Sequence, residues 1–175
     1  MLKQKLINII RNVNDFPKPG IQFKDITPIL KNQELCNEIV AEFTNQLKGQ
    51  KIDAIVGIES RGFLFGFALA NKMNIPFVLI RKAGKLPYKK IAYEYDLEYG
   101  SAVIEMQIDD IKEGWNVLIH DDLLATGGTA EASANLIQMQ KANVAGFAFV
   151  VELDFLKGKE KLNKYSNNIV SLVNF

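Results

Sequence analysis

The chain has only one cysteine, one histidine and one tryptophan among its 175 residues. The single cysteine, Cys36, cannot form a disulfide within the chain, and its mixed, helix-like surroundings are typical of a half-buried small residue. Apolar residues nowhere run together for the roughly 20 positions that a membrane span needs. Charges at Lys3, Lys5 and Arg11 interrupt the N-terminal apolar pattern before it reaches the length of a signal peptide. We therefore expect a cytoplasmic protein that contacts no membrane.

An excess of charge of either sign is also missing. Lysine and arginine number 21, and aspartate and glutamate number 20, which gives a formal net charge of +1. This balance argues against a general binder of nucleic acids or anionic membranes, so any positive site must be local. The sequence contains no repeat, low-complexity segment or linker, and 48% of its residues are hydrophobic. We expect one domain, residues 1–175, with a core that needs no disulfide or structural metal.

Apolar runs and helical patterns alternate along most of the chain, which predicts the α/β class. Continuous apolar runs between helices are typical of a mostly parallel central sheet that is covered on both faces. The predicted strands are 52–58, 76–80, 117–119 and 145–153, and the predicted helices are 2–12, 34–48, 63–71 and 129–141. In the second helix, Leu35, Ile39, Phe43 and Leu47 form one apolar stripe. From 81 to 107 a basic loop leads into an alternating pattern that favours a strand pair or flap.

Residues 117–129 carry the clearest chemical signal. A hydrophobic strand ends in Asp121 and Asp122, and a loop of small residues then opens a helix. Free N–H groups at a helix N-terminus attract phosphate, and glycines let the backbone approach the anion closely. The two acids can accept hydrogen bonds from ribose hydroxyls, so the segment indicates a sugar phosphate. The loop-forming residues are Ala125, Thr126, Gly127, Gly128 and Thr129.

Two common nucleotide motifs do not fit this chain. The loop lacks the lysine of GxxxxGK[ST], and no GxGxxG follows a strand. These mismatches argue against ATP hydrolysis and dinucleotide binding. Taken alone, Gly-Gly-Thr after a strand would as often be an ordinary turn before a capped helix, and the consecutive acids favour the phosphate interpretation.

The run Asp-Asp-Leu-Leu-Ala-Thr-Gly-Gly-Thr resembles the phosphoribosyl-diphosphate motif of the adenine phosphoribosyltransferase family. Further matches follow the order of that family at 16–26, 60–63, 79–87 and 95–100. The resemblance covers most of the chain and implies a type I phosphoribosyltransferase fold, with an N-terminal hood at about 14–30 and a flexible loop at about 81–97. It also implies that adenine and 5-phosphoribosyl 1-diphosphate react to give AMP and diphosphate.

The resemblance assigns roles to individual residues. Gln22, Phe23 and Lys24 would bind adenine, with Phe23 stacking on the base, and Glu98 would act as the catalytic proton donor or relay. The donor would be held by Arg61, Arg81, Lys82, Lys85, Asp121, Asp122, Ala125, Thr126, Gly127, Gly128 and Thr129. Mg²⁺ would be carried mainly by the substrate, and the enzyme would be a homodimer.

Two alternatives remain open at this point. The same donor could react with hypoxanthine, guanine or xanthine, although related hypoxanthine-guanine enzymes have an additional acid where Ala125 stands here. A non-catalytic regulator could instead sense the sugar diphosphate, but no DNA-binding helical pair or basic face is evident in the sequence.

Overall fold

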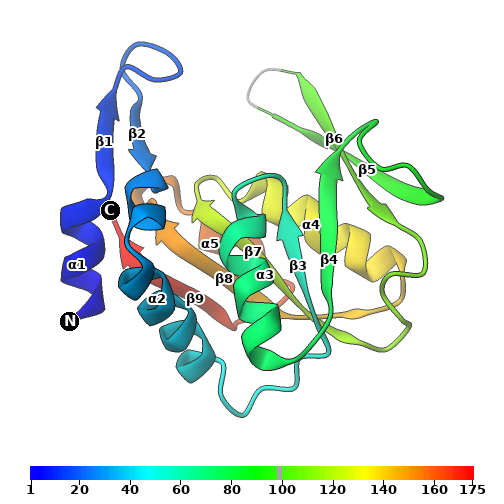
Figure 1. Ribbon diagram of the computed structural model, residues 1–175. Helices are drawn as coiled ribbons and strands as arrows, with labels where there is room; N and C mark the ends of the chain where they lie inside the picture. Colours follow the sequence, from blue (N-terminus) through cyan, green and yellow to red (C-terminus); the bar gives the residue numbers. More distant parts are fainter. Residues whose placement is uncertain (98–99) are drawn as a thin grey trace.

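The computed structural model describes residues 1–97 and 100–175, and a seven-stranded sheet lies at its centre (Figure 1). The strands lie in the order β5-β6-β4-β3-β7-β8-β9. β6 is antiparallel to β4 and β5, and the other neighbouring strands are parallel. The strand bounds are β3 Ala54–Ile58, β4 Phe77–Lys82, β5 Lys90–Asp96, β6 Ser101–Gln107, β7 Asn116–Leu124, β8 Asn143–Glu152 and β9 Ile169–Asn174. The predicted α/β class and mostly parallel sheet are confirmed.

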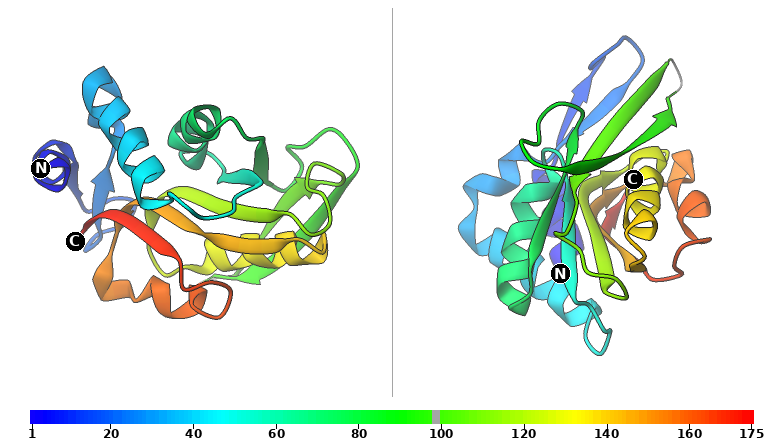
Figure 2. Two further views of the ribbon diagram at one scale, coloured as in Figure 1. Left: turned by 90° about the horizontal axis from the view of Figure 1, so that it is seen from below. Right: turned by 90° about the vertical axis from the view of Figure 1, so that its right-hand side faces the viewer.

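Helices cover both faces of the sheet (Figure 2). α1 (Leu2–Ile9), α2 (Gln33–Gln46) and α3 (Gly62–Met73) enclose one apolar cluster, and α4 (Gly128–Met139) and α5 (Gly158–Leu162) enclose the other. Two short 3-10 helices, Thr27–Lys31 and Asp154–Leu156, complete the helical segments of the described residues. None of the helices in the described part of the chain is long and apolar enough to cross a membrane.

The apolar stripe of α2 explains why this helix forms where the sequence predicts it. Leu35, Ile39, Phe43 and Leu47 are each at most 3% exposed, and all four belong to the first apolar cluster. The side chain of Asn32 caps the helix by accepting a hydrogen bond from the backbone N–H of Leu35 at 3.0 Å. Packing and capping together therefore define this helix.

The N-terminal region differs from the prediction. α1 ends at Ile9, because residues 11–14 enter a strand that continues into the expected loop. β1 (Arg11–Asn14) pairs in antiparallel fashion with β2 (Gln22–Asp25), and Val13 lies opposite Phe23. Each strand has only four residues, and most of them are polar, so neither gives the apolar alternation that marks a strand in a sequence.

The strand pair expected after the basic loop is confirmed as β5 and β6. Ile91, Tyr93 and Tyr95 alternate with exposed residues and pack on the second apolar cluster. α5 and β9 lie beyond the last strand predicted from the sequence and were not expected.

The positions of three strands determine where a site can form. β4, β3 and β7 are parallel neighbours, so their carboxyl ends lie at the same edge of the sheet. The β1–β2 hairpin and the β5–β6 pair rise on either side of this edge (Figure 1). In an open α/β sheet, ligands bind at such an edge.

His120 of β7 is fully buried beneath α3, and its ring meets Phe43 edge-on with 5.5 Å between ring centroids. Neither ring nitrogen has a hydrogen-bond partner among the described residues. Burial lowers the pKa of the imidazole to about 4. This position in β7 therefore suits a side chain that is neutral in the folded protein.

This burial predicts a dependence of stability on acid. The folded-state pKa lies below the ordinary value, so the stabilisation is complete above about pH 6.5 and is lost as the pH falls toward 4. Between pH 7.5 and 5, the free energy of unfolding should fall by about 2 kcal/mol less in His120→Leu than in the unchanged protein. Urea unfolding of both proteins across this pH range measures the difference. Parallel stability curves for the two proteins would contradict the prediction.

Candidate active site

The loop between β3 and α3 lies directly against β7. A Cβ atom on Gly62 would lie 2.7 Å from the carbonyl oxygen of His120 and 3.1 Å from the Cα of Asp121. Only glycine allows this approach without a shift of the backbone. The contact holds the preceding residue, Arg61, next to the acid pair: its Nε is 2.6 Å from Oδ2 of Asp122. This contact is an ion pair, without a hydrogen bond to Oδ2.

The two consecutive acids of β7 have different surroundings. Asp122 is 3% exposed, and Arg61 balances its charge. Asp121 faces the neighbouring cavities, and its Oδ1 accepts a hydrogen bond from the backbone N–H of Asp122 at 2.8 Å. Burial and the adjacent Asp122 carboxylate raise the pKa of Asp121 well above its usual range.

Residues 125–129 form a tight loop between β7 and α4. Gly127 has a positive φ of 83°, and a Cβ there would come within 2.8 Å of the carbonyl oxygen of Gly158. A Cβ on Gly158 would in turn lie 2.3 Å from the carbonyl oxygen of Ala125, so α5 supports the loop from behind. The first N–H groups of α4 have no partners within the helix and can bind an anion. The loop lines a cavity of about 500 Å³ together with Tyr95, Asp121 and other residues.

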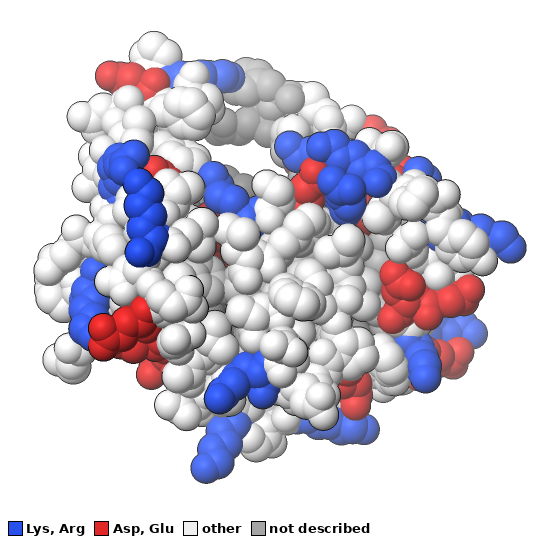
Figure 3. All heavy atoms as spheres, in the orientation of Figure 1, with Lys and Arg blue, Asp and Glu red and all other residues white. Residues whose placement is uncertain are grey.

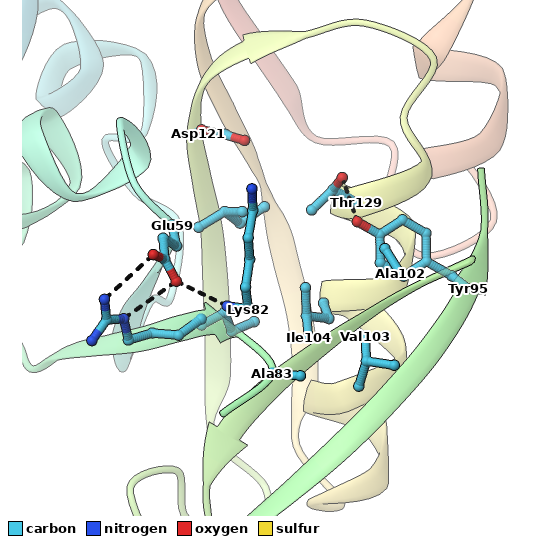
Figure 4. A pocket seen from close by; sticks show the side chains of 12 residues that line it. Glu59, Lys82, Ala83, Tyr95, Ala102, Val103, Ile104, Asp121 and Thr129 are labelled. Atoms are coloured by element: carbon cyan, nitrogen blue, oxygen red, sulfur yellow. Dashed lines mark hydrogen bonds and ion pairs between the residues drawn. The ribbon is translucent and has the colours of Figure 1, made fainter. Parts of the chain in front are cut away.

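A basic turn, residues 81–85, lies at the end of β4 and is held by carboxylates on both sides. Glu59 accepts hydrogen bonds from Arg81 Nε and Nη2 at 3.3 Å each and from the backbone N–H of Lys82 at 2.9 Å (Figure 4). It also accepts a hydrogen bond from Lys85 Nζ at 2.9 Å. Burial favours the neutral acid, but these bonds outweigh it and lower the pKa of Glu59 to about 2. Glu105 holds the turn from its other side through the Gly84 N–H at 3.0 Å.

The structure brings five of the eleven predicted donor residues to one cavity. A cavity of about 480 Å³ is lined by residues from the β3–α3 loop, the basic turn and the end of β7: Glu59, Ser60, Arg61, Lys82, Lys85, Asp121 and Asp122. The space-filling view shows Lys and Arg side chains gathered above the end of β4, beside a hollow that separates them from the N-terminal hairpin (Figure 3). Arg81 lies at the back of the turn, with its side chain on Glu59.

The β1–β2 hairpin reaches this cavity through Arg61. The Arg61 guanidinium carbon lies 5.1 Å from the centre of the Phe23 ring, and Phe16 meets the same ring edge-on at 5.1 Å. The side chain of Gln22 in β2 contacts Asn14 in β1 at 3.5 Å and so remains within the hairpin. Of the three residues predicted to bind adenine, Phe23 therefore contacts Arg61, which is predicted to bind the donor.

Lys24 points in another direction. Its Nζ donates to Oδ1 of Asn12 at 2.6 Å and lies 3.9 Å from the centre of the Phe175 ring, and the residue is 8% exposed. Burial lowers the pKa of Lys24. The side chain anchors the hairpin to the end of β9, which leaves only the backbone of Lys24 for a contact with a ligand.

Three site residues were not predicted from the sequence. Glu59 and Tyr95 lie within segments that match the family or adjoin such a match, but their partners are distant in sequence. Gly158 follows a lysine in an ordinary polar stretch, and no local pattern connects it with the loop at 125–129. Glu98, the predicted catalytic residue, lies outside the described residues.

Comparisons with known proteins agree with this geometry. Residues 24–174 match the model of the phosphoribosyl transferase domain family. An adenine phosphoribosyltransferase of Cytophaga hutchinsonii is 50% identical over 175 residues, which are 100% of this chain and 97% of the relative. The crystal structure of adenine phosphoribosyltransferase from Thermoanaerobacter pseudethanolicus superposes with a TM-score of 0.96 at 46% identity and covers 100% of both chains.

A more distant structure shares the same fold. The adenine phosphoribosyltransferase of Trypanosoma brucei, in complex with AMP, pyrophosphate and ribose-5-phosphate, has a TM-score of 0.90 at 32% identity, covering 99% of this chain and 79% of that one. The mostly parallel sheet is thus the type I phosphoribosyltransferase fold. With its donor motif, its strand-edge cavity and full-length similarity to these enzymes, this chain belongs to the adenine phosphoribosyltransferase family.

Proposed function

We propose that this protein transfers the 5-phosphoribosyl group of 5-phosphoribosyl 1-diphosphate to adenine, forming AMP and diphosphate in purine salvage. The observation that carries the proposal is the meeting of three segments at one strand edge: the loop 125–129, the acid pair of β7 and the basic turn after β4. The loop suits a phosphate, the acid pair suits a sugar, and the basic turn suits a diphosphate.

The donor lies along this edge. Its 5-phosphate rests on the loop 125–129, where the hydroxyls of Thr126 and Thr129 add to the backbone N–H groups of the helix N-terminus. The ribose hydroxyls bind Asp121 and Asp122, which are adjacent to the loop. The diphosphate enters the cavity between Arg61 and the cations Lys82 and Lys85. The volume of this cavity, about 480 Å³, supports the placement.

Adenine binds beneath the hairpin, against the Phe23 ring. In the free protein the Arg61 guanidinium lies over that ring and is paired with Asp122. The diphosphate offers Arg61 a stronger anionic partner, and a turn of Arg61 toward it makes room for the base. The backbone groups of residues 22–24 then read the edge of adenine, while the Lys24 side chain keeps its contacts with Asn12 and Phe175.

Mg²⁺ accompanies the diphosphate and is held chiefly by the oxygens of the substrate. Among the described residues no group of three or more acid, histidine or cysteine side chains could hold a metal, and Asp122 is already paired with Arg61. These surroundings fit an ion that arrives with its ligand. Its positive charge makes the diphosphate a better leaving group.

Bond formation depends mainly on position and charge. N9 of adenine attacks the anomeric carbon as the bond to the diphosphate loosens, and the fixed cations receive the charge that develops on the leaving group. Adenine loses a proton as N9 bonds to the sugar, and Glu98 acts as the relay that takes this proton from the N7 side of adenine; in the reverse reaction it is the proton donor. Residues 81–97 act as a flexible lid that excludes water from the ribosyl centre. We further propose that the enzyme is cytoplasmic and that it forms a homodimer. Light scattering tests the homodimer.

The function is tested by measuring AMP formation from adenine and the donor with Mg²⁺, with hypoxanthine and guanine assayed in parallel. We expect strong turnover that is selective for adenine. Selectivity for another purine would overturn the placement of the base, and donor binding without turnover with any purine would favour a sensor of the sugar diphosphate.

The acid pair gives a first prediction. Asp121→Asn combined with Asp122→Asn should raise the KM for the donor at least tenfold and change the KM for adenine much less, because only the donor carries ribose hydroxyls. Steady-state kinetics with each substrate varied in turn measure both constants. The control is the same double change at Asp109 and Asp110, a second consecutive acid pair between β6 and β7 that does not line these cavities. Unchanged donor kinetics in the first variant would contradict the ribose assignment.

Glu98 gives a second prediction. Glu98→Ala should lower kcat by about 100-fold or more, the usual scale for a positioned acid or base. Rapid-quench measurement of AMP formation separates this loss from slow product release. Glu113→Ala, which removes a surface acid paired only with Lys141, is the control and should leave the rate unchanged. Near-normal turnover of Glu98→Ala would remove the residue from the mechanism.

A further inference from the structure

Tyr95 lies on the β5 face that covers the start of α4. The alternation of β5 places Ile91, Tyr93 and Tyr95 on one face of the strand, where all three pack on the second apolar cluster. Tyr95 is the last of them and the nearest to the loop 125–129. It lines two cavities, and Asp121 and Thr129 line both of these cavities with it.

Two contacts join Tyr95 to the loop. Its hydroxyl lies 3.0 Å from Oγ1 of Thr129, and Figure 4 shows the side chains meeting across the cavity. Its ring lies 3.8 Å from the place where a Cβ on Gly128 would be, which is ordinary van der Waals distance. The tyrosine therefore contacts Thr129, the second residue of α4, through its hydroxyl, and its ring leaves room for a Cβ at Gly128.

We propose that Tyr95 is a positioning residue for the donor phosphate, acting through the hydroxyl of Thr129. The inference rests on the proposed function, in which the loop 125–129 binds the 5-phosphate. A threonine hydroxyl has one hydrogen to donate and two lone pairs to accept. When Tyr95 donates to Oγ1, the Thr129 hydrogen is free to point at the phosphate. The two hydroxyls then form a chain in which each hydrogen bond strengthens the next.

The Tyr95 ring packs on the second apolar cluster. Removal of the hydroxyl alone leaves this packing in place. Tyr95→Phe thus isolates the hydrogen bond from the packing.

The test compares Tyr95→Phe with Tyr93→Phe. Tyr93 lies on the same face of the same strand, and its hydroxyl has no hydrogen-bond partner in the described part of the chain. We expect Tyr95→Phe to raise the KM for the donor about three- to tenfold, the usual effect of one hydrogen bond, with the KM for adenine and the melting temperature unchanged. Tyr93→Phe should change none of these values. Equal donor kinetics in the two variants would overturn the proposal.

Thr129→Val supplies the second arm, because it keeps the shape of the side chain and removes its hydroxyl. If Tyr95 acts through Thr129, the double variant Tyr95→Phe/Thr129→Val should have the donor KM of Thr129→Val alone. Effects that multiply in the double variant would show that Tyr95 acts independently and would overturn the proposal. A raised donor KM in Thr129→Val with no effect of Tyr95→Phe rejects this inference and leaves the phosphate assignment intact. No effect of either change rejects both.

Discussion

The close contact between Gly62 and β7 is the constraint on which the rest of the site depends. With no side chain at this position, the first turn of α3 lies against the backbone of His120 and Asp121. The contact sets the separation between the β3–α3 loop and the acid pair, so that Arg61 meets Asp122 and also reaches Phe23 of the hairpin. A side chain here would push these parts away from one another, although none of them is close to the others in sequence.

Charge pairing within the free site follows from this crowding. Cations that would otherwise repel one another are balanced by carboxylates: Arg61 by Asp122, and Arg81 and Lys85 by Glu59. Burial raises the pKa of both acids, but hydrogen bonds from surrounding cations lower the pKa of Glu59, whereas the adjacent Asp122 carboxylate raises the pKa of Asp121 further.

The sequence predicts the features that depend on local pattern. Apolar runs locate β3, β4, β7 and β8, the stripe of α2 identifies its buried face, and Asp121, Asp122 and the loop 125–129 are found from their order along the chain. Features that depend on distant partners are not predicted. The polar strands of the β1–β2 hairpin, the support of the loop by Gly158 and the grip of Glu59 on the basic turn each join segments that have no common local signal. The direction of the Lys24 side chain is likewise set by Phe175, which lies at the far end of the chain.

A crystal structure of the protein with AMP would test the arrangement of the site most directly, because AMP contains the base, the ribose and the 5-phosphate in one ligand. We expect its phosphate on the loop 125–129 within reach of the Thr129 hydroxyl, its ribose hydroxyls on Asp121 and Asp122, and its base against Phe23 in the place that the Arg61 guanidinium takes in the free protein. A phosphate bound at the basic turn, or a base that leaves Arg61 over the Phe23 ring, would contradict this arrangement.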